Sequence, residues 1–430
     1  MRWIMITLVP LALLTSAAIA QNSLPPQPPR MVDGQPIETR NPEKAGDKPL
    51  FPEQTRAPYR ASVPFKVTTL VDNLHVTWGM DFLPDGRMLL TERLPGALRI
   101  LDKNNVLSPP VQEITSVGAG KEIVLLDVAV DPNFRRNHRI FFTFCDFIRQ
   151  PSLNNTNTYV ASARLDGDKL SNVKVIFRAT PQWPARGLGG KTGGRIVFGP
   201  DGNLFVTIGD RDTSPALTYD WFAAQKLDNH LGKVIRITPD GAPAPGNPFI
   251  GQAGALPEIW AYGLRSPEGL AADPRTGALW ESELGPRGGD EINIIKKGAN
   301  YGWPVITHGL DYPGVAIGEG IAAKDGMEQP AYYWDPSANP AGIVFYKGNL
   351  FPQWRNSLFV AMMNGKFVSR LTLSGNKVVA EEPMLMDLNT RFRDVDVGPD
   401  GAVYVLTDSG TANINPNTPP TTKLLKLTPK

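Results

Sequence analysis

The stretch Gly199–Asp210, GPDGNLFVTIGD, combines a turn signal with a strand signal. Proline, aspartate and glycine in its first four positions favour a tight turn. The residues on both sides, RIVF (Arg195–Phe198) before the turn and NLFVTIGD after it, alternate as strands do. The stretch therefore predicts a strand, a tight turn and a second strand.

This phrase recurs along the chain, and the recurrence predicts the fold. Six copies can be counted, beginning at Leu83, Asp131, Gly199, Asp273, Phe351 and Gly398. They lie about 45 to about 85 residues apart, which leaves room for four short strands per copy. Convincing helical periodicity is scarce, and Tyr219–Lys233 offers at best a short helix. Repeats that are all β and can stack radially imply a propeller.

We therefore expect one all-β domain over residues 63–430, a six-bladed β-propeller in which FKVTTL (Phe65–Leu70) helps to close the ring. Ligands of propellers bind at the mouth of the central channel, which the long loops between blades build. Loops with unusual residues are thus the place to look for a site.

The N-terminus resembles a secretory signal. Residues 1–20 contain one arginine, an apolar run and small residues at A-x-A spacing, which predicts cleavage after Ala20. The alternative is an uncleaved membrane anchor, but the run is short for the roughly 20 residues that span a bilayer. The only cysteine, Cys145, has no partner for a disulfide. We expect a periplasmic or secreted protein with no membrane span.

Residues 21–62 are rich in proline and polar side chains, so we expect them to form a linker or a strap that lies over the propeller. We call this segment the strap. The whole chain has 44 basic and 42 acidic residues, which gives no electrostatic reason to expect a nucleic-acid partner. A small molecule is the expected partner.

The segment GGKT (Gly189–Thr192) matches the end of a nucleotide-binding P-loop, but its surroundings do not. A P-loop needs a strand before the glycines and a helix that begins at Lys-Thr. RATPQWPARGL (Arg178–Leu188) has two prolines, and a strand pattern follows the motif instead of a helix. We interpret the segment as a glycine-rich loop before a strand.

Four stretches carry a family resemblance: Glu258–Gly309, Arg391–Asp408, His230–Gly241 and Gly193–Arg211. Together they resemble the glucose/sorbosone dehydrogenase family from about Leu70 onward. The resemblance implies a soluble, periplasmic aldose dehydrogenase that uses pyrroloquinoline quinone (PQQ) with calcium.

The resemblance assigns the cofactor carboxylates to Arg391 and Arg393. These residues alternate on a predicted strand, so both should point to one face, and arginine suits carboxylates. The alternative is an exposed strand face that meets Asp394. Gly285 and Pro286 match positions whose carbonyls bind the cofactor-linked calcium, although a plain turn is the other interpretation.

Further roles come from the same resemblance. Asp290 lies near the family's active site and is a candidate catalytic residue. Trp334 and Ser337 match an aromatic residue and a hydroxyl beside the quinone, with a core tryptophan as the alternative for Trp334. Lys191 stands where the family has its general base, a histidine.

The candidate site departs from the family pattern at other positions too. Glu122 replaces a glutamine, Leu284 replaces a histidine or glutamine, and Asn364 aligns with a cofactor-binding lysine for which Lys366 could compensate. A lysine base works near neutral pH only where burial or nearby cations favour its neutral form. Besides Lys191, the candidates for the base are therefore Glu122, Asp290 and, with less support, His308.

Three functions stay open at this point. The first is a PQQ- and calcium-dependent dehydrogenase that oxidises an aldose or related sugar or aldehyde and passes electrons to a periplasmic acceptor. The second is a divergent propeller that binds a sugar or a partner without redox turnover. The third is a calcium-dependent lactonase, for which the arginine pair has no evident use. Fold alone does not separate them.

Overall fold

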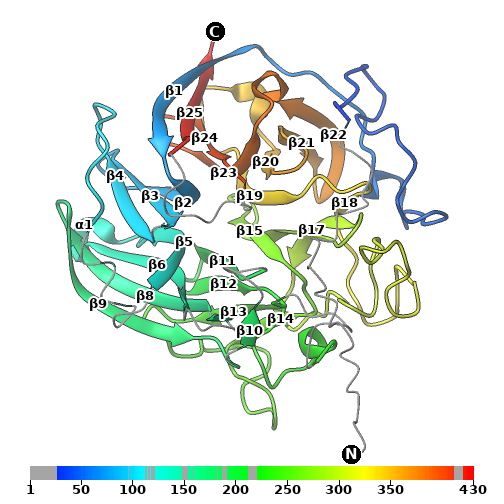
Figure 1. Ribbon diagram of the computed structural model, residues 1–430, viewed down its shortest axis with the longest axis horizontal. Coiled ribbons are helices and arrows are strands. Elements are labelled where there is room, and N and C mark those ends of the chain that lie inside the picture. Colours follow the sequence, from blue (N-terminus) through cyan, green and yellow to red (C-terminus); the bar gives the residue numbers. More distant parts are fainter. Residues whose placement is uncertain are drawn as a thin grey trace, which may run out of the picture.

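The computed structural model describes residues 27–94, 96–111, 114, 117, 122–147, 154–156, 158–181, 183–185, 191–211, 220–410 and 420–430. In these residues, antiparallel sheets of three or four strands are arranged radially around a central axis as six blades (Figure 1). This arrangement confirms the predicted all-β, six-bladed propeller.

The first three blades follow one another along the chain. The first contains β2 (Val76–Phe82), β3 (Met88–Leu94) and β4 (Ala97–Leu101). The second contains β5 (Glu122–Val130), β6 (Arg139–Phe147), β8 (Thr158–Asp166) and β9 (Lys169–Arg178). The third contains β11 (Gly193–Phe198), β12 (Leu204–Ile208), β13 (Lys233–Ile237) and β14 (Ile259–Tyr262). A separate two-stranded sheet pairs β7 (Asn154–Thr156) with β10 (Trp183–Ala185).

The next two blades repeat the pattern. The fourth contains β15 (Pro267–Ala272), β16 (Leu279–Glu283), β17 (Asp290–Ile295) and β18 (Tyr332–Trp334). The fifth contains β19 (Pro340–Phe345), β20 (Ser357–Met362), β21 (Val368–Ser374) and β22 (Lys377–Met384). The described helices are short: α1 (Phe134–Asn137), η1 (Pro52–Gln54), η3 (Ala223–Gln225), η4 (Pro352–Trp354) and η5 (Met386–Leu388).

The sixth blade joins the two ends of the propeller. It contains β23 (Arg391–Val397), β24 (Val403–Asp408), β25 (Thr422–Pro429) and β1 (Phe65–Leu74). β1 pairs antiparallel with β25 from Phe65↔Pro429 to Leu74↔Thr422. The ring is therefore closed by the first strand of the propeller, as FKVTTL predicted.

The six repeats of the sequence form the turns between the first and second strands of the blades. In five of these turns an aspartate accepts a hydrogen bond from the backbone N–H two residues later, at 2.7 to 3.1 Å. Aspartate favours turns because its side chain makes this local bond. The aspartates are Asp85, Asp131, Asp201, Asp273 and Asp400.

Every innermost strand has a register shift, which marks a β-bulge or irregularity. A buried hydroxyl on the second strand often bonds to this region. Thr207 accepts from the backbone N–H groups of Gly194 (3.1 Å) and Arg195 (3.0 Å), and donates to the carbonyl of Pro267 in the next blade (3.1 Å). The same hydrogen bond to a backbone carbonyl of the next blade is donated by Thr91, Thr143 and Ser282. We call these four hydroxyls the blade latches.

Candidate active site

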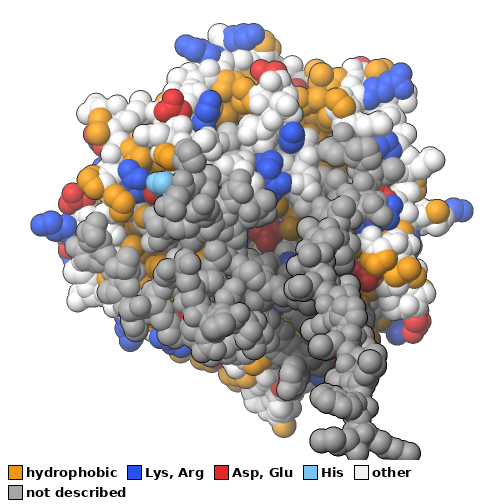
Figure 2. All heavy atoms as spheres, in the orientation of Figure 1, with side chains coloured by type: hydrophobic (Ala, Val, Ile, Leu, Met, Phe, Trp, Pro, Cys, Tyr) orange, Lys and Arg blue, Asp and Glu red, His pale blue; other side chains and the backbone are white. Residues whose placement is uncertain are grey.

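The predicted site residues all lie at one end of the blades, opposite the repeated turns. In an antiparallel blade the start of the first strand and the end of the second strand meet at the same end. Arg391 begins β23, Glu122 begins β5, and Gly285 follows the end of β16. The same topology places Lys191, Asp290, Trp334, Ser337 and Lys366 at this end. Figure 2 views the molecule in the orientation of Figure 1, with both acidic and basic side chains near the centre of the face.

The two arginines converge on one carboxylate. Arg391 Nε donates to Asp408 Oδ2 at 3.2 Å, and Arg393 Nη2 donates to the same oxygen at 3.0 Å. This confirms that both side chains share a face. The alternative partner, Asp394, instead forms an ion pair with Arg195 at 3.0 Å. Arg393 is only 3% exposed, so the pair does not lie on an exposed strand face.

The arginine pair has a hydrogen-bond donor that the described part of the chain does not use. Arg393 Nη1 also reaches Glu268 Oε2 at 3.4 Å, while Arg393 Nε is buried without a hydrogen-bond partner in the described part of the chain. Burial lowers the pKa of Arg391, and the Arg393 guanidinium adds to this effect. Burial and Arg393 also lower the pKa of Arg93, a buried residue of β3. A carboxylate ligand would give this donor an acceptor and favour the charged form of both guanidiniums.

The loop after β16 is tightly folded around Gly285. Its backbone N–H donates to Asp290 Oδ1 at 2.8 Å, and its carbonyl accepts from Arg265 Nη1 at 2.7 Å. A Cβ at this position would lie 2.2 Å from the carbonyl oxygen of Gly288, so only glycine fits. Ser337 joins the loop, since its Oγ accepts from the Gly288 N–H at 3.0 Å. The main-chain carbonyls of Gly285 and Pro286 therefore lie in a fixed loop.

Asp290 is buried at the centre of this arrangement. Its Oδ2 accepts from the backbone N–H groups of Ala338 (2.8 Å) and Asn339 (2.7 Å), while Ser337 Oγ donates to Oδ1 at 3.2 Å. Burial raises the pKa of Asp290 to about 6, although these hydrogen bonds oppose the shift. These contacts favour a role for Asp290 in positioning the loops around it. Its predicted catalytic role stays a prediction.

Trp334 and Lys366 both have protein partners in the structure, and their predicted roles beside the cofactor stay predictions. Trp334 is 6% exposed, packs edge-on against Tyr332 and donates its indole N–H to Glu381 Oε1 at 3.0 Å. These contacts favour the core interpretation of the tryptophan. Lys366 is exposed, and its Nζ donates to Asn389 Oδ1 at 3.1 Å. Asn364 takes the place near the pair, since its Oδ1 accepts from Arg391 Nη1.

The candidate bases differ in how the structure places them. Lys191 is partly exposed, lies two residues before β11 and has a left-handed backbone with φ of 45°. A strand follows it, which rules out the P-loop geometry. His308 is 1% exposed and pairs with Asp47 of the strap at 2.8 Å, so it does not reach the mouth. The side chain of Glu122 and the signal segment lie outside the described residues.

Comparison with known proteins identifies the family of the chain. The sequence profile of the Glucose / Sorbosone dehydrogenase family matches residues 74–415. The chain belongs to the glucose/sorbosone dehydrogenase family. It is 38% identical to the aldose sugar dehydrogenase YliI of Escherichia coli (strain K12) over 86% of this chain and 95% of that protein.

Two solved structures of aldose sugar dehydrogenases resemble the propeller over nearly their whole length. The apo-form of the soluble aldose sugar dehydrogenase from Escherichia coli superposes with a TM-score of 0.75 at 37% identity, covering 85% of this chain and 100% of that one. The PQQ-bound form of the aldose sugar dehydrogenase from Streptomyces coelicolor gives a TM-score of 0.65 at 27% identity, covering 85% and 99%. The resemblance stated from the sequence is thereby confirmed.

The sequence analysis did not identify three charged residues that surround the arginine pair. Asp408, Glu268 and Arg93 are all buried at the same end of the blades. Asp408 directly follows the buried Thr407 of β24, and Arg93 lies two residues after the buried Thr91 of β3. The sequences LTER and LTD at the ends of these predicted strands could have indicated the three-dimensional pairing, because charged residues in an apolar strand are rarely buried without a partner.

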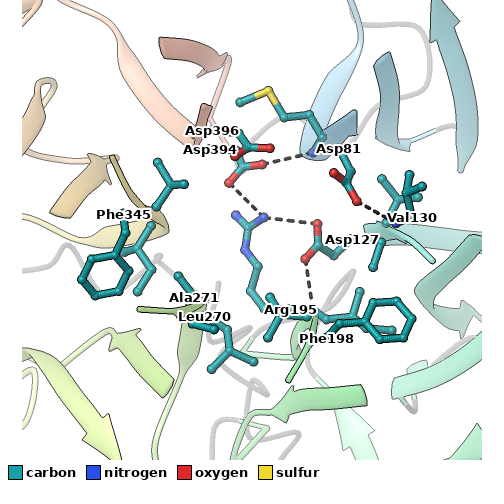
Figure 3. Close-up of a pocket in the computed structure, with 18 of the residues that line it drawn as sticks. Asp81, Asp127, Val130, Arg195, Phe198, Leu270, Ala271, Phe345, Asp394 and Asp396 are labelled. Atoms are coloured by element: carbon teal, nitrogen blue, oxygen red, sulfur yellow. Dashed lines mark hydrogen bonds and ion pairs between the residues drawn. The ribbon is translucent and has the colours of Figure 1, made fainter. Parts of the chain in front are cut away.

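The half of the central channel opposite the candidate site contains a cavity with several charged residues. A cavity of about 360 Å³ is lined by residues of the innermost strands of all six blades. Figure 3 shows Arg195 pointing between Asp127 and Asp394, with Asp81 and Asp396 nearby. Burial raises the pKa of Asp81 to about 7, and it raises that of Asp394 to about 7 although Arg195 opposes it. This ring of charges ties the first, second, third and sixth blades together.

Proposed function

We propose that this family member is a periplasmic quinoprotein that oxidises an aldose, or a related sugar or aldehyde, with PQQ and calcium. One observation carries the proposal: a buried guanidinium (Arg393) and a partly buried one (Arg391) converge on a single carboxylate, and Arg393 Nε has no hydrogen-bond partner in the described part of the chain. PQQ is a tricarboxylate, and bidentate arginine contacts suit carboxylates. The PQQ-bound relative from Streptomyces coelicolor supports the same cofactor.

The described residues could bind calcium only if the cofactor supplied further ligands. No group of three or more His, Cys, Asp or Glu residues in the described ranges could hold a metal ion. Calcium prefers oxygen ligands, and the Gly285 and Pro286 carbonyls would supply two of them together with oxygens of the cofactor. The Gly285 carbonyl already accepts from Arg265 Nη1, so it would bind calcium through its second lone pair. Bound PQQ and calcium would supply the electron sink for hydride removal from the sugar carbon.

The chain's own residues would bind and orient the reactants. Arg391 and Arg393 would hold carboxylates of the cofactor, with Asn364 and Asp408 fixing the two side chains. Ser337 and Asp290 would keep the Gly285–Gly289 loop in place. Lys191 would take the proton of the sugar hydroxyl, because it occupies the position of the family's base.

The remaining parts of the proposal rest on the sequence. The signal-like residues 1–20 support export, and electrons would then pass to a periplasmic acceptor. No helix in the described ranges is long and apolar enough to cross a membrane.

Reconstitution tests the activity. Purified protein should reduce an artificial dye in the presence of an aldose only after PQQ and calcium are both added. A protein that binds PQQ but reduces no dye with any aldose would instead support the alternative, a divergent propeller without turnover. The lysine at the base position is the observation that favours this second function.

A further inference from the structure

The strap makes a second layer of contacts behind the candidate site. Its described part, residues 27–62, runs along the outer side of the fourth and fifth blades and is dark blue in Figure 1. Thr55 pairs with Tyr333 and Tyr59 with Glu381 as isolated bridges. The strap lies outside residues 74–415, which the family profile matches. Its contacts therefore lie outside the part of the chain that the family profile describes.

Three strap contacts meet the loops that form the proposed calcium site. Glu43 Oε2 accepts from Arg287 Nε at 2.7 Å, and Arg287 directly follows Pro286. The backbone N–H groups of Glu43 (2.8 Å) and Lys44 (3.3 Å) donate to the carboxylate of Asp335. Asp335 in turn lies against the loop, since a Cβ on Gly288 would come within 2.5 Å of its Oδ1.

Neighbouring contacts hold the same part of the strap. Lys44 Nζ donates to the carbonyl of Thr307 at 2.6 Å. Asp47 pairs with His308 at 2.8 Å, and the His308 ring stacks on Tyr333 with centroids 3.9 Å apart. The side chains of Glu43 and Asp47 are 2% and 6% exposed, so both carboxylates are shielded from solvent. Shielded, hydrogen-bonded pairs of this kind are costly to break on one side.

We propose that the strap is a positioning element of the active site, in which Glu43 fixes Arg287 and thereby the loop that presents the Gly285 and Pro286 carbonyls to calcium. This inference rests on the proposed function. The loop needs such support because Gly288 and Gly289 both have positive φ, 76° and 70°, and glycine restricts the backbone least. Partners outside the ligand shell commonly change metal affinity 10- to 100-fold.

A pair of matched variants tests the strap. Glu43→Gln removes the charge that holds Arg287, whereas Glu53→Gln removes an exposed strap contact to Lys377 of β22 at 3.3 Å. The calcium concentration at which half of the protein binds PQQ should rise about tenfold in Glu43→Gln and stay unchanged in Glu53→Gln. In an Arg287→Met background, Glu43→Gln should add nothing, because the two residues act as one unit.

Hydrogen exchange of the segment 285–289 in the cofactor-free protein gives a readout that does not depend on the proposed function. Exchange should be faster in Glu43→Gln than in wild type or Glu53→Gln. If Glu43→Gln and Glu53→Gln have the same exchange rates and the same calcium dependence, the positioning role is wrong. If the wild type binds no PQQ, the proposed function fails, and the exchange rates alone decide whether the strap holds the loop.

Discussion

At the scale of single residues, Asp408 decides what the arginine pair can do. Burial by itself raises the pKa of Asp408, but Arg393 and Arg391 outweigh it and hold the pKa below its usual range. The carboxylate therefore stays charged and satisfies only part of the two guanidiniums. The sequence predicted the shared face of Arg391 and Arg393 from their alternation. It did not predict Asp408, because the partner lies on the neighbouring strand.

Lys191 gives the sharpest test of catalysis at this scale. Lys191→Met should lower aldose-dependent dye reduction by about 10²- to 10⁴-fold, the usual contribution of a general base, while PQQ still binds. Methionine is an unbranched side chain of similar length without a proton acceptor of this kind. Dye-reduction rates of the PQQ-loaded proteins measure the effect.

Lys191→His is the matched control, since histidine restores the family's residue and tolerates a left-handed backbone better than most side chains. It should retain activity and shift the pH profile toward the range in which imidazole titrates. If Lys191→Met is as active as wild type, Lys191 is not the base, and Glu122 and Asp290 become the candidates to vary.

At the scale of elements, the turns were predictable and the blade latches were not. A turn such as GPDG carries its own signal, because aspartate and glycine act locally. A latch joins a hydroxyl on one strand to a carbonyl of the next blade, about sixty residues away for Thr207 and Pro267. The threonine or serine recurs in the repeats at Thr91, Thr143, Thr207 and Ser282, but its partner appears only in three dimensions.

Removing one latch should destabilise the fold measurably. Thr207→Val keeps the shape but leaves two buried N–H groups and one carbonyl without their partner, so the free energy of unfolding should fall by about 2 kcal/mol or more. Equilibrium unfolding in urea measures this change in the free energy of unfolding. Thr207→Ser should recover most of the loss, as Ser282 makes the same bond in the fourth blade. The exposed Thr69→Val should change little. Equal effects of Thr207→Val and Thr69→Val would contradict the latch.

At the scale of the whole molecule, the six sequence repeats correctly predicted the six blades of the propeller. Closure through β1 and β25 was predictable because an unpaired strand pattern precedes the first repeat. The docking of the strap and the charges in the channel were not predictable, since both depend on which blades face each other. Arg195 and Asp394 are distant in sequence but meet at 3.0 Å on the axis.

The channel aspartates predict how stability depends on pH. Burial raises the pKa of Asp81 from 3.8 to about 7, so the folded protein binds this proton at a higher pH than the unfolded chain. The contribution of Asp81 to the free energy of unfolding should therefore rise as pH falls from about 7 to about 4. Asp81→Asn should remove that rise, so the difference between variant and wild type should change by about 1 kcal/mol or more between pH 8 and pH 5.

Urea unfolding at both pH values measures this difference, and Asp240→Asn serves as the control because its side chain is 86% exposed. The control should show no comparable pH effect. A difference between Asp81→Asn and wild type that is the same at pH 8 and pH 5 would mean that Asp81 keeps an ordinary pKa in the folded protein.

The most direct test of the central claim is an absorbance titration of the purified protein with PQQ at saturating calcium. Wild type should bind PQQ, and Arg391→Ala/Arg393→Ala should bind it at least about a hundredfold more weakly, because charge-assisted hydrogen bonds are each worth about 1.5–3 kcal/mol. Arg391→Ala alone leaves the buried Arg393–Asp408 pair intact and should give an intermediate loss. Arg236→Ala, which removes an ion pair with Asp201 in the third blade, should bind PQQ like wild type. Equal PQQ affinity of the wild type and the folded double variant, or no PQQ binding by the wild type, would contradict the account.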